Sequence, residues 1–291
     1  MEVVIHAGVH ATDEDRLVKC LLRNKEKFLE TGVATPGPSR YRQLLRDAMV
    51  AVERGAVEPG AREVLLDAIM EQDHVNRLLL SSENFFCNPK LAISGDRFYH
   101  RAERRLADFC TLFAGDEVEL FLAIRDPGTF IPAIFAASPE EDFPTFLQDT
   151  DPTRLRWSEL ITRLRDNLPN VALTVWCNED TPLIWAALVR EIAAQDPDAQ
   201  VLGGYDILRE IMSREGMRRF RAYIDTHPDL TERQKRRVIA AFLDKYAEED
   251  KIAEEVDLPG WDDTMMDVLA EIYEEDVDAI ERMDGVTFIA P

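Results

Sequence analysis

Residues 118–124 read Val-Glu-Leu-Phe-Leu-Ala-Ile, and this stretch decides the fold class of the 291-residue chain. It is the clearest strand in the sequence, and Arg125-Asp126-Pro127 ends it with a turn signal. Further apolar runs predict strands at residues 3–7, 76–82, 171–177 and 286–289. Because helical patterns separate these runs, the strands are expected to pair in parallel through right-handed crossovers. The sequence therefore predicts an α/β protein, a three-layer parallel sheet with helices on both faces.

The helical patterns show apolar residues recurring at steps of three and four. They predict helices at residues 13–31, 39–55, 60–72 and 97–115, and further helical stretches that begin at Thr129 and Arg154. Residues 204–281 contain no strand signal and predict a helical C-terminal subregion. The chain has no internal repeat and no low-complexity tract, so we expect residues 1–291 to form one domain.

The composition excludes several classes of function. Hydrophobic residues make up 46% of the chain and charged residues 31%, which is ordinary for a protein with a packed core. The 34 basic and 56 acidic residues give a net charge of −22, which repels nucleic acids and anionic membranes. No run approaches the ~20 apolar residues that span a bilayer, and the N-terminus lacks the pattern of a signal peptide. We therefore expect a cytoplasmic protein with no nucleic-acid or membrane partner.

The charge is unevenly distributed in the C-terminal subregion. Basic residues cluster at 209–221 and again at 233–237, whereas the chain becomes strongly acidic from Glu248 onward. Two interpretations are open: solvated helix faces that attract each other, or a basic surface that meets an anionic ligand.

Cysteines and tryptophans carry little functional signal. The 4 cysteines form no CxxC pair, and in a reducing compartment they are expected to be small buried hydrophobes. The 4 tryptophans are expected in the core or at an interface.

Polar residues follow each predicted strand, and ligands of parallel α/β sheets bind beyond the carboxyl ends of the strands. These ends nominate His10, Glu83, Arg125 and Glu179 as candidate site residues. The alternatives are structural: Glu83 could accept backbone amides in a loop, and Arg125 could anchor one.

Residues 5–15 occupy the strand-to-helix turn where phosphate loops are found. A phosphate loop needs glycines, a lysine against the phosphates, and a Ser or Thr at the helix start. Here only Gly8 and Thr12 remain, and Asp13-Glu14-Asp15 opens the helix. Acids suit the helix dipole but repel a phosphate, so this turn by itself is typical of an ordinary helix start.

Several segments nevertheless resemble the sulfotransferase superfamily, especially its bacterial branch, whose members open with His-x-Gly-x-His-Lys-Thr-Gly-Thr-Thr-Ser. The matching residues 6–16 read His-Ala-Gly-Val-His-Ala-Thr-Asp-Glu-Asp-Arg. The further matches, in the family's order, are residues 24–32 with 35–37, Leu-Leu-Ser-Ser-Glu at 79–83, Ile-Arg-Asp-Pro at 124–127 and residues 273–286. The resemblance implies a fold like that of P-loop NTPases, and sulfuryl transfer from PAPS (3′-phosphoadenosine 5′-phosphosulfate) to an acceptor.

The resemblance also shows what the donor site has lost. The family's lysine falls on Ala11, its Gly-Thr-Thr-Ser on residues 13–16, and the serine that helps to bind the 3′-phosphate on Ala133. A charged contact is worth about 1.5–3 kcal/mol, so these losses predict a severely weakened donor site. Arg125 survives, and Gly8, Thr12 and Arg16 are the other residues expected near PAPS or its product PAP.

If sulfuryl transfer persists, Glu83 is the expected general base, and His10 and His100 are the next candidates for that role. Arg16 is the only cation near the place of the missing lysine. His6, His10 and Glu83 raise the alternative of a metal site. The HxxxH spacing on a strand does not bring both imidazoles to one centre without a turn, so we expect no metal.

Two functions follow from the sequence. The first is a sulfotransferase-like enzyme that is impaired or inactive, or that is active with an altered donor or an unidentified acceptor such as a small molecule. The second is a non-catalytic binding protein that keeps the fold and uses the cleft or the acidic C-terminal helices to engage a protein partner.

Overall fold

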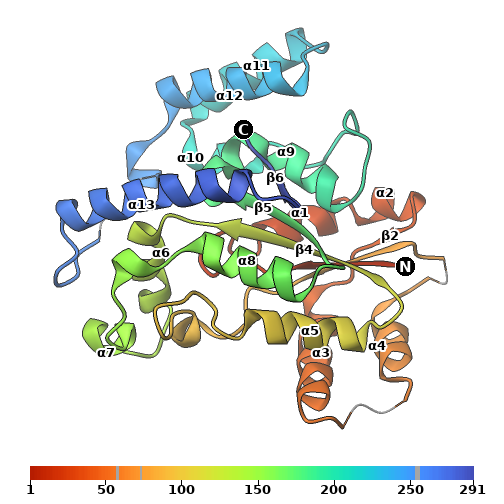
Figure 1. The fold of residues 1–291 in the computed structure, drawn as a ribbon. Coiled ribbons are helices and arrows are strands. Elements are labelled where there is room, and N and C mark those ends of the chain that lie inside the picture. The colour runs from red at the N-terminus through yellow and green to blue at the C-terminus, as the bar shows by residue number, and fades with distance from the viewer. Residues whose placement is uncertain (57–58, 73, 253–255) are drawn as a thin grey trace.

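The computed structural model describes residues 1–56, 59–72, 74–252 and 256–291. At its centre lies a six-stranded sheet in the order β2-β3-β1-β4-β5-β6, and every neighbouring pair of strands is parallel (Figure 1). The strands are β1 (Glu2–His6), β2 (Val33–Ala34), β3 (Arg77–Ser81), β4 (Glu117–Ile124), β5 (Ala172–Cys177) and β6 (Val286–Phe288). The parallel α/β class predicted from residues 118–124 is confirmed, and five of these strands overlap the predicted runs.

The sequence prediction misses the edge strand β2. This strand has two residues, Val33 and Ala34, which pair with Arg77 and Leu78 of β3. A run of that length is too short to show the alternation by which a strand is recognised.

Helices connect the strands and cover both faces of the sheet. The α-helices are α1 (Arg16–Arg23), α2 (Lys25–Glu30), α3 (Pro38–Glu53), α4 (Ala61–Ile69), α5 (Ala102–Leu112), α6 (Pro127–Ala136), α7 (Phe143–Leu147), α8 (Trp157–Asn167), α9 (Thr181–Ile192), α10 (Asp206–Ile211), α11 (Arg214–Thr226), α12 (Glu232–Tyr246) and α13 (Asp263–Glu281). Short 3-10 helices are η1 (Pro89–Leu91), η2 (Pro152–Arg154), η3 (Asn178–Asp180) and η4 (Glu249–Lys251).

Two of the predicted helices differ from the structure. The helix expected at 13–31 begins only at Arg16 and is divided at Asn24, whose side-chain amide donates to the carbonyls of Cys20 and Leu202 at 2.9 Å each. The helix expected at 97–115 begins only at Ala102, because Tyr99 has a φ of 47°, outside the helical region. As a result, residues 13–15 and His100, which are near or among the candidate site residues, lie in loops and not in helices.

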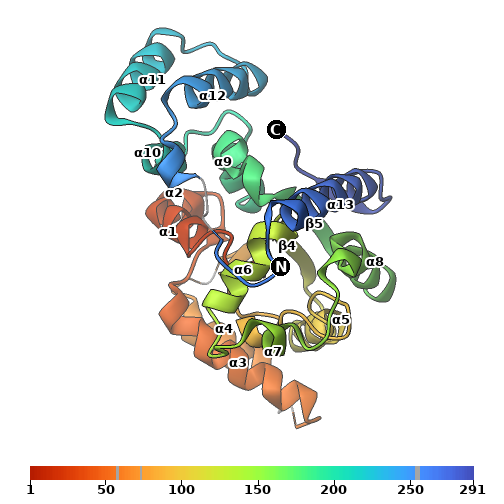
Figure 2. The ribbon, with the colours of Figure 1, turned by 90° about the vertical axis from the view of Figure 1, so that its left-hand side faces the viewer.

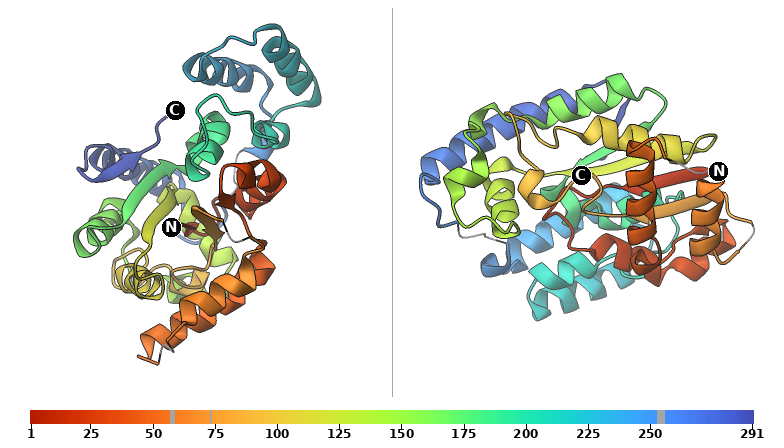
Figure 3. Two further views of the ribbon diagram at one scale, coloured as in Figure 1. Left: turned by 90° about the vertical axis from the view of Figure 1, so that its right-hand side faces the viewer. Right: turned by 90° about the horizontal axis from the view of Figure 1, so that it is seen from below.

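The alternation of side chains along β1 divides the core into two layers. Val3 and Ile5 pack in the larger cluster with α3, α4, α5, α6, α8 and α13, whereas Val4 packs with α1, α2 and α9 on the opposite face. Seen from below, the strands lie between α8 and α13 on one side and α1 on the other (Figure 3). The predicted three-layer arrangement is confirmed.

Helices α11 and α12 project from the body of the molecule above α9 and α10 (Figure 2). They share with α10 a small core around Leu208, Phe220 and Ile239. Helices also fill much of residues 204–281, as predicted, although residues 253–255 of that range lie outside the described part of the chain.

The two interpretations of the uneven charge can be compared with the ion pairs. Arg209, Arg219 and Lys235 pair locally with Asp206, Glu215 and Glu232. Within the described ranges, no ion pair joins the basic clusters at 209–237 to the acidic segment after Glu248. In the part of the chain that the structure describes, the residues of the basic clusters that form ion pairs therefore do so with acids outside the segment after Glu248.

Each tryptophan is buried, as predicted. Trp157, at the start of α8, stacks on Phe98 with ring centroids 3.9 Å apart. Cys20 and Cys177 are buried, Cys87 and Cys110 are half-buried, and all are free thiols. In the described part of the chain, no helix is both long and apolar enough to cross a membrane.

Candidate functional site

The candidate site is the loop of residues 7–15, which joins β1 to α1 at the carboxyl edge of the sheet. Gly8 has a φ of +52°, and a Cβ on it would lie 3.0 Å from the Cα of Glu83, so glycine is required where the loop passes β3. Ala11, Glu14 and Asp15 also have positive φ values of 57°, 48° and 62°. Such values are uncommon outside glycine, so the loop is more tightly wound than an ordinary helix start. We call residues 7–15 the acidic loop.

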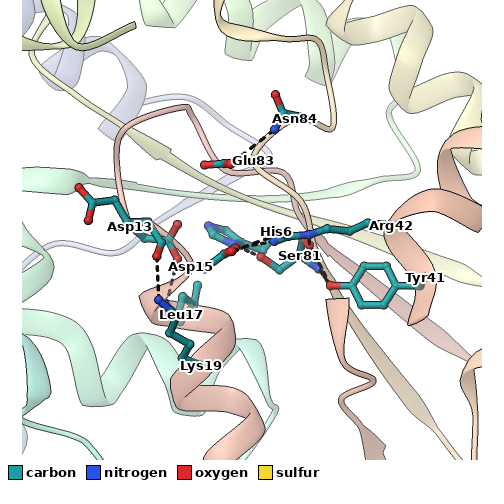
Figure 4. A network of polar contacts seen from close by, with 11 residues as sticks. His6, Asp13, Asp15, Leu17, Lys19, Tyr41, Arg42, Ser81, Glu83 and Asn84 are labelled. Carbon is teal, nitrogen blue, oxygen red and sulfur yellow. Dashed lines mark hydrogen bonds and ion pairs between the residues drawn. The ribbon is translucent and has the colours of Figure 1, made fainter. Parts of the chain in front are cut away.

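The carboxylates at the end of the acidic loop are held within the chain. Asp15 accepts two hydrogen bonds from the guanidinium of Arg42, at 2.5 and 3.2 Å, and Arg42 also donates from Nε to the carbonyl of Ser81 at 3.0 Å (Figure 4). These bonds hold the pKa of Asp15 below its usual value. Asp13 accepts a bond from the backbone N–H of Leu17 at 3.0 Å, which satisfies one free donor of α1.

Tyr41 fixes the start of α3 against the end of β3. Its hydroxyl donates to the carbonyl of Ser81 at 2.8 Å and accepts from the N–H of Ser81 at 2.7 Å. The guanidinium of the next residue, Arg42, is thereby placed beside the acidic loop. Sequence reasoning missed Arg42, which reads as an ordinary polar residue in a helix and lies 27 positions from Asp15.

Glu83 follows β3 and lies half-buried near the acidic loop. Burial raises the pKa of its carboxyl group, and the charge of Asp15 adds to the shift, with smaller contributions from Asp13 and Glu14, while Arg42 opposes it. A carboxylate with a raised pKa is a better proton acceptor, as the role of general base requires. Asn84 donates weakly to Glu83 at 3.5 Å.

His10 is buried and has partners at both ring nitrogens. Nδ1 lies 2.8 Å from the hydroxyl of Tyr99, and that hydroxyl also accepts from the backbone N–H of His10 at 3.2 Å. Because Oδ1 of Asn84 can only accept, Nε2 of the neutral imidazole carries the proton and donates to it at 3.3 Å, and Nδ1 accepts from the Tyr99 O–H. Burial lowers the pKa of the imidazole. Both nitrogens are thus engaged, and the arrangement makes His10 a positioning residue for the loop.

His6 points to the opposite face of the sheet. Its ring stacks on Trp176 at a centroid distance of 5.9 Å, and Nδ1 lies 3.0 Å from the hydroxyl of Ser81. Burial lowers the pKa of His6, although the charge of Asp13 opposes the shift. His6 and His10 therefore have separate partners. Among the described residues, no group of three His, Cys, Asp or Glu side chains could hold a metal ion.

The polar groups expected to bind a donor are engaged elsewhere. The Thr12 hydroxyl donates to the carbonyl of Val9 at 2.6 Å within the loop. Arg16 points to α10, where Nε donates to Glu210 at 2.7 Å, and it also pairs with Glu14 at 3.2 Å. The structure therefore does not place Arg16 as a substitute for the missing lysine.

Arg125 and Glu179 tie the strand ends together. The buried guanidinium of Arg125 donates to the carbonyl of Ala11 in the acidic loop and, at 3.0 Å, to the hydroxyl of Thr129. Glu179 accepts from the N–H of Asp126 at 2.9 Å and from the hydroxyl of Tyr273 at 2.9 Å. The structural alternative for Arg125, an arginine that anchors a loop, fits these contacts.

His100 is exposed and does not join the acidic loop. It lines a cavity at the start of α5, together with Arg101, Arg104 and Arg105. Sequence reasoning missed these arginines, although their spacing of three and four residues places them on one face of a helix.

The chain was compared with known proteins in three ways. No family model matches it, and neither a curated protein nor a solved structure matches it either.

Proposed function

We propose that this chain is a ligand-binding protein built on a sheet edge of the phosphate-loop type, and that it does not transfer sulfuryl groups from PAPS. One observation carries the proposal: Asp15 sits at the start of α1 with the guanidinium of Arg42 clamped on its carboxylate. In a phosphate loop, an anion from the ligand occupies the helix N-terminus. Here a carboxylate of the chain itself supplies negative charge at that terminus.

The surroundings of this pair support the proposal. Asp13, Glu14 and Asp15 repel a phosphate, and the nearby cations Arg16 and Arg42 already pair with acids. A donor would have to displace Asp15 from Arg42 and then bind without a lysine, and each lost charged contact costs about 1.5–3 kcal/mol.

Sulfuryl transfer is the competing function, and Glu83 is the observation that favours it. Its carboxyl group lies near the acidic loop and has a raised pKa, which suits a base that accepts the proton of an acceptor hydroxyl. A base alone does not bind a donor, however, so the two functions differ in whether PAP binds.

The test is thermal unfolding with and without millimolar PAP. It compares the natural chain with a variant in which the family's loop residues are restored: Ala11→Lys, Asp13→Gly, Glu14→Thr, Asp15→Thr and Arg16→Ser. We expect no shift for the natural chain and an upward shift of several degrees for the variant, because a ligand at 100 times its dissociation constant adds about 2.7 kcal/mol. Sulfate at the same ionic strength is the control for general salt effects.

A shift of the natural chain by PAP would overturn the proposal and favour a sulfotransferase. Failure of a folded variant to bind PAP, also after Ala133→Ser restores the serine for the 3′-phosphate, would show that the acidic loop is not of the phosphate-loop type. If the variant with five substitutions does not fold, the double variant Ala11→Lys with Asp15→Thr replaces it. This double variant also releases Arg42 from Asp15.

A further inference from the structure

A second site at the carboxyl edge is a cavity of about 240 Å³ between the loop after β3, the end of α3 and the start of α5. This volume is far above the ~10–15 Å³ that one water molecule needs on the same measure, and it is enough for a small organic molecule. Phe86, Cys87 and Leu91 form its apolar wall, and Arg101, Arg104 and Arg105 reach it from α5. We call it the arginine cavity.

The positive charge in the arginine cavity is only partly balanced. Arg101 pairs with Glu53 at 2.5 Å. Within the described ranges, the side chains of Arg104 and Arg105 make no ion pair, and the one side-chain hydrogen bond of Arg105 runs from Nε to the carbonyl of Phe85 at 3.2 Å. Asp108 also lines the cavity, so the charged side chains on its wall sum to one net positive charge, from three arginines against Glu53 and Asp108. The chain as a whole carries −22.

The half-buried guanidinium of Arg105 lies in an environment that disfavours its charge. Burial lowers its pKa; Glu53 and Asp108 oppose that shift, and Arg101 and Arg46 add to it. An anion from solution would lower the cost of keeping this guanidinium charged.

The position of these arginines on α5 adds to the imbalance. Arg104 lies in the first turn, where the positive end of the helix dipole disfavours cations. The acid of that turn is Glu103, which pairs with Arg163 of α8 and forms no ion pair with Arg104 or Arg105 among the described residues. A bound anion would therefore supply charge that the helix itself does not provide.

We propose that the arginine cavity binds a small organic oxyanion, with its charged group against Arg104 and Arg105 and an apolar portion against Phe86 and Leu91. The inference rests on the proposed binding function, because it names the class of ligand. It uses side chains outside the acidic loop, so its failure and that of the PAP experiment are distinguishable.

The experiment titrates phenyl phosphate into the natural chain by calorimetry, with inorganic phosphate and benzyl alcohol as probes of each half of the ligand. We expect phenyl phosphate to bind at least about tenfold more tightly than either probe, because each half alone forfeits the other's contacts. Equal binding of phenyl phosphate and inorganic phosphate would overturn the apolar half of the proposal, and no binding at millimolar concentration would overturn all of it.

Matched variants locate the site. Arg104→Gln should weaken binding about tenfold or more, since it removes a charged contact. Arg218→Gln on α11, which also removes an exposed arginine without a hydrogen bond or ion pair among the described residues, should leave binding unchanged. Leu91→Ser should weaken the binding of phenyl phosphate and leave the binding of inorganic phosphate unchanged. For Arg105 the substitution is Arg105→Lys, because lysine keeps a positive charge at this half-buried position.

Equal affinities of the Arg104→Gln and Arg218→Gln variants would overturn the assignment to this cavity. The side chain of Arg104 is exposed and makes no hydrogen bond or ion pair within the described part of the chain, so its substitution is not expected to disturb the fold.

Discussion

The acidic loop and the arginine cavity follow neighbouring strands, β1 and β3, and are opposite in charge. In the acidic loop, carboxylates gather and the nearby Arg42 is already bound to Asp15. In the arginine cavity, guanidinium groups gather, and Arg104 and Arg105 have no acid bound to them among the described residues. The local charge of a site can therefore differ in sign from the net charge of −22 of the whole chain. One site is filled by the chain itself, whereas the other leaves room for an anion from outside.

The largest effect is expected from Arg42→Met, which leaves Asp15 without its cation beside the other carboxylates. Both side chains are partly buried, and Arg42 also satisfies the carbonyl of Ser81. We expect the free energy of unfolding to fall by about 2 kcal/mol, measured by urea denaturation.

The matched control is Arg40→Met on the same helix. Arg40 pairs with Glu71 at 2.5 Å, but both side chains are more than half exposed. Such surface pairs contribute little, so the loss should stay below about 0.5 kcal/mol. Similar losses for the two variants would show that the Asp15–Arg42 pair is an ordinary surface ion pair.

A smaller effect concerns the pH dependence of stability. The pKa of Glu83 is raised in the folded chain above its ordinary value of 4.5, so the folded state holds this proton more tightly than the unfolded state does. Stability from this group is therefore present below the ordinary pKa and is lost as the pH rises through the raised one. Glu83→Gln should stabilise the chain at neutral pH, by less than about 1 kcal/mol given the partial exposure of the carboxyl group.

Asp15→Asn is the counterpart with the opposite sign. The pKa of Asp15 is lowered by its bonds to Arg42, so its contribution is present above its ordinary value of 3.8 and is lost as the pH falls through the lowered one. Unfolding midpoints of both variants and the natural chain should be measured between about pH 2 and pH 7. The Glu83→Gln variant should gain stability relative to the natural chain as the pH rises above 4.5, whereas the disadvantage of Asp15→Asn should shrink as the pH falls below 3.8. Parallel curves would contradict this account of the two carboxylates.

The sheet could be predicted from the sequence because its strands are apolar runs with polar residues after them. Buried parallel strands need no alternation, because both faces are covered: Leu78 and Leu120 pack in the larger cluster, and their neighbours Leu79 and Phe121 pack in the cluster on the opposite face. The strand ends also placed Glu83 and His10 correctly at the same edge, since parallel strands end together.

The contacts within the site could not be predicted. Arg42 and Tyr99 reach the acidic loop from α3 and from the segment before α5, and no spacing in the sequence joins them to Asp15 and His10. The direction of Arg16 depends on Glu210, almost two hundred residues away in the chain. Side-chain partners of this kind depend on tertiary packing, which a pattern of hydrophobic residues does not encode.

The smallest effect tests the arginine cavity in the free protein. Arg104 lies near the positive end of the dipole of α5, so Arg104→Gln should raise the free energy of unfolding by about 0.3 kcal/mol or slightly more at low salt. Arg218→Gln, in the middle of α11, should leave it unchanged. Added phosphate should remove the advantage of Arg104→Gln, because an anion held by Arg104 stabilises the natural chain and not the variant. If the variant is less stable than the natural chain at low salt, Arg104 stabilises the folded protein. That result would contradict the view that its charge is unbalanced until an anion binds.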